Sequence, residues 1–455
     1  MPDTPLPARI TPPAAPLRAV PLLRAILRNP IEAMPPAVFT DPVVVHPFLG
    51  RDRVFIQDPD LIQRVLVSDA DLFVKSDAMR RALEPALGQA ILTADGDHWR
   101  WQRRAVAPIF RHDRLRAFTQ PMLDAAIRRR DRWLSLGPGA EIELGHEMMH
   151  TTFDIILETM LSGQGAIDAV RVERGIADYL ESTGWAIALA MVKAPAWTPH
   201  PGRRRAARAR DYLRAELLRM VSERRGRGSE RQDLVALLLA ARDPETGQAM
   251  DDRDVADNLL TFITAGHETT ALALTWAFYL LALHPSAEER ALSEIAGATG
   301  GRPLTTESLD ELPFTRALVQ EAMRLYPPAP IIARTATQDV PLGPITVPAG
   351  SPVYVPVYAL HRQPRLWPEP DRFDPDRFAP EAVRGRHRYA YLPFGAGPRI
   401  CIGLTFAMLE AVAILATLLP ALRLRPPSGF TPGLQMRITL RPAPGMPMRL
   451  EPRMT

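Results

Sequence analysis

The chain has 455 residues, of which 46% are hydrophobic and 23% are charged. A chain of this length and composition can bury a large core, which excludes a wholly disordered protein, and the lack of linkers and repeats favours one domain over residues 1–455. The net charge of +4 comes with arginine runs such as 203–205, which are typical of solvated helix faces, so no nucleic-acid partner is expected.

Residues 1–16 are proline-rich and lack the pattern of a signal peptide, so we expect them to be disordered. An amphipathic helix around Leu22 follows and should end before Pro30. No apolar run reaches the roughly 20 residues that a spanning helix needs, so no transmembrane anchor is predicted. The lone cysteine, Cys401, excludes an intramolecular disulfide and favours a cytoplasmic protein.

The order of predicted elements indicates a mainly helical protein with a small β region. Residues 43–45 and 53–56 are predicted strands, and residues 58–316 have apolar residues at helical spacing. Prolines become dense after Pro327, where residues 353–355 resemble a strand. Residues 403–419 are predicted to form an apolar helix, and residues 436–440 and 448–450 a C-terminal hairpin.

One predicted helix, residues 251–284, is unusually long and is interrupted at its centre by the polar run 265–270. At 1.5 Å per residue it would extend about 50 Å, the width of the domain. Polar groups inside a buried helix are costly unless they are satisfied, and a glycine there weakens the helix. We therefore expect this centre to pack against a polar feature or to line a cavity.

The strongest local pattern surrounds Cys401. Residues 394–403 read Phe-Gly-Ala-Gly-Pro-Arg-Ile-Cys-Ile-Gly and precede the apolar helix. Helix N-terminal amides near the sulfur are expected to stabilise a thiolate and lower its pKa, making it a soft metal ligand. A buried free cysteine is the alternative. A single thiolate excludes sites that need several cysteines, and leaves a metal whose other ligands come from a macrocycle.

This decapeptide resembles the cysteine-ligand loop of the cytochrome P450 family, Phe-Gly-x-Gly-x-Arg-x-Cys-x-Gly, at every defined position. The resemblance extends over nearly the whole chain and implies the cytochrome P450 fold, mainly α with a small β region. It implies haem b, iron protoporphyrin IX, as cofactor, with Cys401 as the axial ligand of the iron. It also implies a monooxygenase that inserts one atom of dioxygen into an apolar substrate.

Three further motifs match the family. Glu321 and Arg324 match its Glu-x-x-Arg, and with Arg377 they resemble its Glu-Arg-Arg network, for which we expect a structural role in bracing the cysteine loop. Surface ion pairs are the alternative for these residues taken singly.

The centre of the long helix matches the family's oxygen-activation motif. The resemblance implies that the Thr269 hydroxyl donates to bound dioxygen, that Glu268 links the site to solvent protons, and that Gly266 leaves room above the porphyrin. His267 is the variable position of the motif and should point elsewhere. A helix kink with a satisfied threonine is the alternative.

The resemblance also implies partners for the haem propionates. Trp99 and Arg103 match the family's Trp-x-x-x-Arg, whose ends share a helix face, and Phe394 belongs to the cysteine loop. The expected remaining partners are Arg399, Arg334 and, as an extra, His98.

A competing pattern is His146-Glu147-x-x-His150, which fits the zinc signature of metallopeptidases, with Glu173 as a conceivable third ligand. A zinc peptidase would contain no haem. The sequence also leaves open a haem-binding sensor or electron carrier, whereas the intact Glu268–Thr269 pair disfavours a peroxide-driven enzyme.

The substrate and the electron donor are less defined by the sequence. Apolar candidate pocket segments suit a fatty acid, a terpenoid or a carotenoid, and the segment 185–197 is a core helix, a lid or a contact with a membrane surface.

No reductase segment follows the cysteine loop, so we expect a separate ferredoxin or flavodoxin. Basic residues expected to form its docking face are Arg104, Arg111, Arg384, Arg386 and Arg388.

Overall fold

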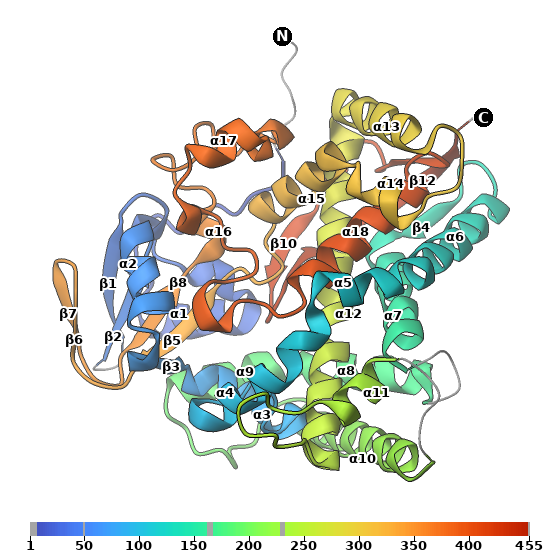
Figure 1. The fold of residues 1–455 in the computed structure, drawn as a ribbon. Coiled ribbons are helices and arrows are strands. Elements are labelled where there is room, and N and C mark those ends of the chain that lie inside the picture. Colours follow the sequence, from blue (N-terminus) through green and yellow to red (C-terminus); the bar gives the residue numbers. More distant parts are fainter. Residues whose placement is uncertain (1–6, 49–50, 162–166, 228–232, 454–455) are drawn as a thin grey trace.

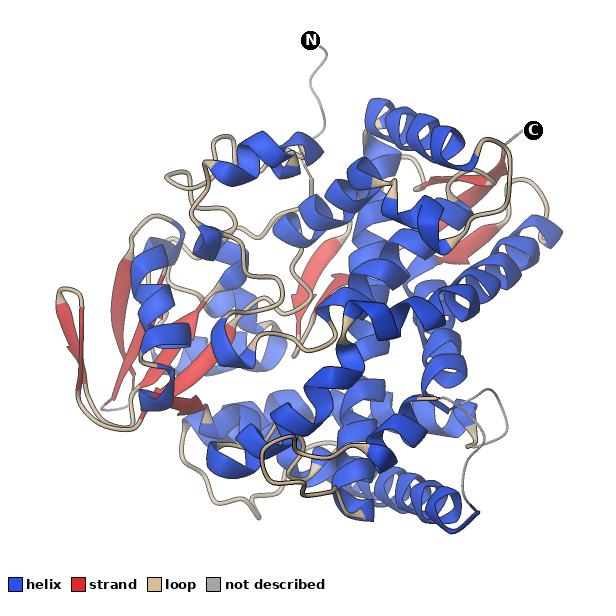
Figure 2. Cartoon of the chain, in the orientation of Figure 1, coloured by secondary structure: helices blue, strands red, loops and turns tan. Residues whose placement is uncertain are grey.

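The computed structural model describes residues 7–48, 51–161, 167–227 and 233–453. Helices make up most of this part, and the strands form small groups at its edges and near its centre (Figure 2). The prediction of a mainly helical protein with a small β region is confirmed.

The helices follow one another along most of the chain (Figure 1). Their bounds are α1 Ala19–Arg28, α2 Pro59–Gln63, α3 Asp77–Leu87, α4 Gly96–Val106, α5 His112–Leu115, α6 Thr119–Ser135, α7 Leu144–Leu161, α8 Ala169–Glu181, α9 Thr183–Met191, α10 Arg203–Arg227, α11 Leu234–Ala240, α12 Asp252–Leu283, α13 Pro285–Thr299, α14 Thr306–Asp310, α15 Pro313–Leu325, α16 Val357–Leu360, α17 Pro380–Arg384 and α18 Leu404–Leu418.

The largest sheet joins early and late segments of the chain. Its strands are β1 (Val43–Phe48), β2 (Arg51–Ile56), β8 (Pro352–Val355), β5 (Ile332–Ala336) and β3 (Phe73–Lys75), in that order. Only β2 and β8 pair in parallel within this sheet. In the β3–β5 pair, Lys75 lies opposite Arg334, which brings two cations together at the edge strand.

The long central helix is present as predicted. Asp251 caps α12, and its side chain accepts a hydrogen bond from the Asp254 amide in a reciprocal capping box. The helix ends where Pro285 begins α13. It packs on α7, α15 and α18 and crosses the middle of the molecule (Figure 1). The centre of α12 is therefore held by neighbours on several sides.

The C-terminal strands pair differently from the predicted hairpin. β10 (Gly433–Met436) pairs with β11 (Leu440–Ala443), whereas β12 (Pro447–Pro452) pairs with β4 (Glu141–Glu143) and β9 (Leu422–Arg425). The remaining pair is β6 (Val340–Leu342) with β7 (Ile345–Val347). The prediction was wrong because neither partner of β12 is the neighbouring strand β11, and one of them, β4, lies far away in the sequence, where local pattern gives no signal.

Part of the proline-rich start is ordered, contrary to expectation. Ala8 is buried, and its carbonyl accepts a hydrogen bond of 2.8 Å from the Tyr326 hydroxyl. The Ile10 amide donates to the Tyr358 hydroxyl at 3.1 Å. Residues 1–6 lie outside the described residues. These tertiary hydrogen bonds hold a segment that has no helical or strand pattern of its own.

Within the described residues, no single helix is both long and apolar enough to cross a membrane. The pair α12 and α13 passes that test only in combination, with a bend of 113° between them.

Candidate functional site

The cysteine loop is a tight turn that only glycines can form. Gly395 and Gly397 have φ of +72° and +70°, a region that side chains rarely adopt. A Cβ on Gly397 would lie 2.0 Å from the Leu66 carbonyl oxygen. The Cys401 amide closes the turn by donating to the Phe394 carbonyl at 2.9 Å, just before α18 begins. Phe394 itself is partly buried against the main core.

The thiol of Cys401 does not have the lowered pKa that its sequence context suggested. Although the side chain is exposed, surrounding protein atoms raise its pKa, and the Gly403 amide and the Arg103 charge offset this only in part. Desolvation of the sulfur by these atoms opposes the charged form more strongly than one amide and one cation favour it. A bound metal cation deprotonates a thiol outright, so ligation rather than the helix terminus would produce the thiolate.

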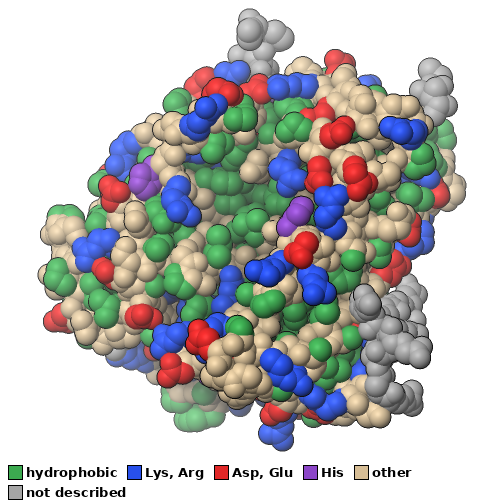
Figure 3. Space-filling view, in the orientation of Figure 1, with side chains coloured by type: hydrophobic (Ala, Val, Ile, Leu, Met, Phe, Trp, Pro, Cys, Tyr) green, Lys and Arg blue, Asp and Glu red, His purple; other side chains and the backbone are tan. Residues whose placement is uncertain are grey.

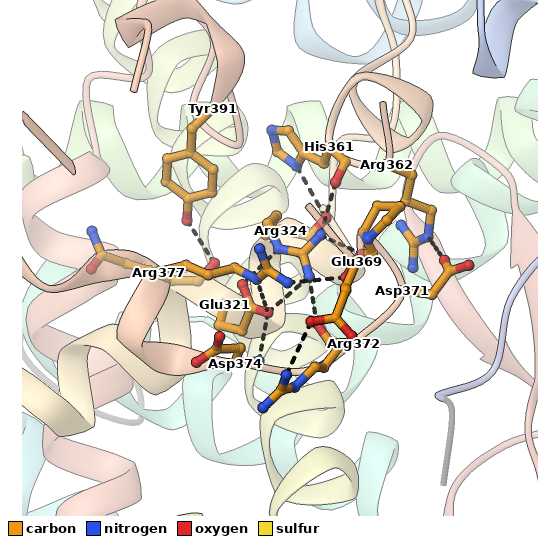
Figure 4. A network of polar contacts seen from close by, with 12 residues as sticks. Glu321, Arg324, His361, Arg362, Glu369, Asp371, Arg372, Asp374, Arg377 and Tyr391 are labelled. Carbon is orange, nitrogen blue, oxygen red and sulfur yellow. Dashed lines mark hydrogen bonds and ion pairs between the residues drawn. The ribbon is translucent and has the colours of Figure 1, made fainter. Parts of the chain in front are cut away.

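The Glu321–Arg324 pair is fully buried and is therefore not a surface ion pair (Figure 4). The guanidinium of Arg324 donates to both Glu321 oxygens at 2.6 and 2.8 Å. Its other donors reach the carbonyls of His361, Pro370 and Arg372 at 2.7–2.9 Å. Arg377 lies 3.7 Å from Glu321, so the three expected residues do come together.

His361 connects this network to the cysteine loop. Its Nε2 accepts from the Leu392 amide at 2.9 Å, two residues before Phe394. Its ring stacks on Tyr391, whose hydroxyl donates to the Gln320 carbonyl on α15. Burial holds the pKa of His361 well below its usual value, so the ring is neutral and can accept at Nε2. The sequence analysis missed His361 because no local pattern marks it.

The centre of α12 presents Ala265 and Thr269 on an accessible side. Ala265 is exposed although most of the helix is buried, and the Thr269 hydroxyl donates to the Ala265 carbonyl at 2.8 Å. A Cβ on Gly266 would lie 2.9 Å from Ile156 Cδ1 on α7, so helix packing provides its own reason for this glycine. His267 points to α7, where its ring packs on Phe153.

Glu268 is buried and engaged by the C-terminal strands. Its Oε1 accepts a hydrogen bond from the Thr439 hydroxyl and forms an ion pair with the Arg441 guanidinium. Both partners lie 171 residues or more after Glu268 in the sequence. The side chain of Arg441 is 29% exposed. Arg441 thus connects the buried carboxylate to solvent, and no local pattern indicates this partner.

Three cations gather around one carboxylate near the cysteine loop. Arg399 pairs with Asp95 and donates to the Ala94 carbonyl at 3.0 Å. Burial and the Arg399 charge lower the pKa of Arg334 to about 10. Burial, with Arg334 and Arg399, lowers the pKa of Lys75 to about 7. Only Asp95 acts in the opposite direction, so the cluster has an excess of positive charge.

The tryptophan motif on α4 lies beside this cluster. Arg399 stacks over the Trp99 ring at 4.2 Å, and Arg103 is close enough to Cys401 for the two charges to interact. His98, the extra propionate partner expected from the sequence, contacts other groups: its Nε2 is 3.2 Å from the Gln89 carbonyl and its ring packs on Trp101. Lys75 is the cation of the cluster that the sequence analysis missed, because β3 is too short to show a motif.

The zinc pattern on α7 does not assemble. Glu147 is held by Arg129 and by the Trp133 indole, which donates at 2.8 Å. His150 pairs with Glu173 at 3.4 Å, whereas the His146 side chain is 83% exposed. Throughout the described ranges, no group of three or more histidine, cysteine or acidic side chains could hold a metal ion.

Comparisons with known proteins agree with this arrangement. The cytochrome P450 family model matches residues 37–446. The chain belongs to the cytochrome P450 family. A cyclooctat-9-en-7-ol 5-monooxygenase of Streptomyces melanosporofaciens is 35% identical, covering 89% of this chain and 87% of the relative. Cytochrome P450 4A6 of Oryctolagus cuniculus is 32% identical, covering 88% and 81%. The haem domain of cytochrome P450DA matches with a TM-score of 0.83 at 25% identity, covering 99% and 98%.

This cytochrome P450 is therefore an oxidoreductase that incorporates an oxygen atom of dioxygen into an organic substrate, and its cofactor is haem b. The residues present fit that cofactor. Cys401 offers one exposed sulfur, and the Lys75, Arg334 and Arg399 cluster has more positive charge than Asp95 can balance. The carboxylates of protoporphyrin IX would supply the charge that buried cations require.

Glu410 on α18 is a second buried acid near the site that the sequence analysis did not single out. It is fully buried, and within the described part neither carboxyl oxygen has a well-formed hydrogen bond; the Thr270 hydroxyl is the polar group beside it. Burial raises its pKa from 4.5 to about 8. Glu410 is therefore protonated in the folded protein at neutral pH.

This raised pKa predicts how stability depends on pH. The folded state keeps a proton that the unfolded chain releases above pH 4.5, so Glu410 lowers the free energy of unfolding as the pH rises from about 4.5 to about 8. The slope is about 1.4 kcal/mol per pH unit. In Glu410→Gln this loss should be absent. The free energy of unfolding measured with urea should therefore rise in the variant, relative to the parent, between pH 5 and pH 8. A difference that stays constant over that range would contradict the shift.

Proposed function

We propose that Cys401 ligates the haem iron and that Thr269 and Glu268 supply protons beside it. The observation that carries this proposal is the exposed Cys401 sulfur in a glycine turn braced, through His361, by the buried Glu321–Arg324 pair. When bound, the haem supplies the iron at which dioxygen is reduced. Phe394 shapes the same turn by accepting from the Cys401 amide.

The chain's own residues divide the remaining work. Lys75, Arg334 and Arg399, with Trp99 and Arg103 beside them, would hold the propionates. The Thr269 hydroxyl holds a proton at the accessible centre of α12, where it donates a hydrogen bond to the Ala265 carbonyl. Glu268 is paired with the Arg441 guanidinium, so we propose that it takes part in proton delivery by exchanging that partner.

The test is the absorption spectrum of the reduced protein with carbon monoxide. The parent should give a strongly red-shifted Soret band, because in this proposal the Cys401 thiolate would ligate the haem iron. Cys401→His offers a neutral ligand at the same place and should give a band typical of histidine ligation. A parent spectrum without haem, or an unchanged band in Cys401→His, would refute the ligand assignment.

We propose a terpenoid-like cyclic hydrocarbon as the most suitable of the three expected substrate classes. The support comes from two relatives, the cyclooctat-9-en-7-ol 5-monooxygenase and a cyclooctatin synthase 34% identical over 409 residues, both of Streptomyces melanosporofaciens. Phe262, buried three residues before Ala265, adds an apolar group to the same helix. Fatty acids and carotenoids are the comparison compounds in a screen for substrate-induced Soret shifts.

We further propose a cytoplasmic enzyme that receives electrons from an acidic ferredoxin or flavodoxin. Figure 3 shows Lys and Arg side chains around a hollow with hydrophobic walls on the face where α18 lies in front. Some expected docking arginines have other contacts: Arg104 pairs with Asp243, Arg384 with Glu381, and Arg386 stacks on Trp367. Arg111 and Arg388 are exposed and make no ion pair with a described residue.

Charge reversal should therefore change the rate of reduction most at Arg111 and Arg388. We expect Arg111→Glu/Arg388→Glu to slow reduction by a ferredoxin about tenfold at low salt, because steering depends on complementary charge. The effect should shrink at high salt, where the charges are screened. Stopped-flow measurement of the first electron transfer provides the rates, and rates equal to the parent's at low salt would exclude this docking face.

A further inference from the structure

The side chain of Asn29, at the end of α1, connects the N-terminal helix to the C-terminal hairpin β10–β11. Its amide nitrogen donates to the Leu434 carbonyl, and its amide oxygen accepts from the Met436 amide, both at 2.8 Å. Asn29 is buried, and its φ of −159° is extended backbone that any residue adopts. The backbone therefore does not require asparagine here, whereas the two hydrogen bonds to the hairpin do.

These hydrogen bonds lie on the open edge of a small sheet. Among the described strands, β10 pairs only with β11. A two-stranded hairpin is marginally stable by itself, and an unpaired edge leaves backbone donors and acceptors without partners. Asn29 bonds a carbonyl and an amide two residues apart, as a third strand would. Its side chain thus completes the hydrogen bonding along β10.

Asn29 is itself held by the structure on both sides of it. Its backbone amide donates to the Ala25 carbonyl at 2.7 Å, and its carbonyl accepts from the Glu32 amide at 3.0 Å. Ile26 and Ile31, which precede and follow it, are both buried in apolar clusters. Asn29 can therefore act as a fixed support for β10.

The register of the hairpin extends this support toward Glu268. The two residues that Asn29 bonds lie on either side of Gln435, and Gln435 is opposite Arg441 in the ladder. Arg441 and Thr439 both contact the Glu268 carboxylate. A shift of β10 would therefore move the two groups that hold this carboxylate.

The second strand of the hairpin has supports of its own. The Leu440 amide donates to the Pro328 carbonyl at 3.0 Å, and the Leu440 carbonyl accepts from the Trp276 indole of α12 at 3.5 Å. These contacts should keep β11 near α12 when β10 is released. Loss of the Asn29 side chain should therefore loosen the hairpin without unfolding the protein.

We propose that Asn29 is a positioning residue for Glu268, because it fixes the hairpin that carries Thr439 and Arg441. Within the described residues Asn29 makes no hydrogen bond to Glu268, so it acts through β10 and β11. This inference rests on the proposed function, in which Glu268 takes part in proton delivery. Proton transfer requires a group held within reach of its acceptor, so a loosened hairpin should slow it.

The first test is hydrogen exchange of the haem-loaded protein, measured by mass spectrometry over residues 433–443. Asn29→Leu keeps the side-chain volume and removes both hydrogen bonds, so exchange there should be at least about tenfold faster. The matched control is Gln57→Met, because Gln57 is also a fully buried amide but donates to the Val38 carbonyl at 2.9 Å. It should leave this exchange unchanged. Equal exchange in the parent and in Asn29→Leu would overturn the proposal.

The second test measures proton delivery without a substrate or a redox partner. The dithionite-reduced enzyme is mixed with air-saturated buffer, and the return of the oxidised Soret band is followed in ordinary and in heavy water. We expect Asn29→Leu to slow this return about threefold and to increase its solvent isotope effect, as Glu268→Gln should. Gln57→Met should change neither. The red-shifted carbon monoxide band should persist in every variant, since Cys401 is untouched.

A double-mutant cycle separates positioning from a general structural effect. If Asn29 acts through the hairpin, adding Asn29→Leu to Arg441→Met should change the rate less than about 1.5-fold further. Fully additive effects would overturn the proposal. An unchanged rate in Asn29→Leu beside a slowed Glu268→Gln would overturn this inference alone. An unchanged rate in Glu268→Gln would overturn the proposed role of Glu268 and this inference with it.

Discussion

Replacing Arg324 by methionine should leave little or no folded, haem-containing protein. Methionine removes five hydrogen bonds and leaves Glu321 buried with only the Asp374 amide at 2.9 Å and Arg377 at 3.7 Å. Breaking a buried ion pair by removing one partner costs about 3–5 kcal/mol, a large share of a typical folding free energy. The loss should also reach the cysteine loop, because Arg324 holds the His361 carbonyl.

Arg372→Met is the matched control for this prediction. Arg372 lies in the same network, but its side chain is 54% exposed and pairs only with Glu369 at 3.1 Å, while its carbonyl still accepts from Arg324. We expect its cost to stay below about 1 kcal/mol. Soluble yield, the ratio of haem to protein absorbance and urea unfolding measure both variants. Normal haem content and stability in Arg324→Met would refute the bracing role.

Replacing Thr269 by alanine should separate reductant consumption from product formation. The hydroxyl is the only polar side-chain group that this residue offers, and proton delivery by a positioned group contributes about 10²–10⁴-fold to rate. Alanine should fold well, because Thr269 is not part of the buried core and bonds only its own helix. We expect product per reductant consumed to fall about tenfold and hydrogen peroxide to increase.

Thr269→Ser keeps the hydroxyl and should retain most of the coupling. Both variants should keep the red-shifted carbon monoxide band, since Cys401 is untouched, which separates loss of proton delivery from loss of haem. The measurement is product, reductant and peroxide in one reaction mixture. Equal coupling in the parent and in Thr269→Ala would show that the proton comes from another group.

The two carboxylates near α12 differ in environment and should differ in role. Glu268 has a cation beside it and a path to solvent through Arg441, whereas Glu410 has neither an ion-pair partner nor a well-formed hydrogen bond in the described structure. Burial favours the neutral form of an acid. Glu410 is thus suited to keep a proton, whereas the ion pair of Glu268 connects its carboxylate to a partly exposed side chain.

Local patterns in the sequence were enough to predict the family, the mainly helical fold class and the candidate site residues that belong to short motifs. The spacing of Glu321 and Arg324, the glycines around Cys401 and the capped helix with Thr269 at its centre are all readable because helix and turn geometry depend on near neighbours. For the same reason the bounds of α12 and α18 were predicted within a residue or two.

Which distant groups meet depends on the tertiary fold. Arg441 reaches Glu268 from a strand 173 residues later, His361 connects Arg324 to the loop, and Lys75 joins Arg334 through the β3–β5 pairing. Burial, which sets the raised pKa of Cys401 and of Glu410, also depends on the whole fold. Local pattern specifies backbone shape, whereas charge partners and dielectric surroundings are properties of the assembled core.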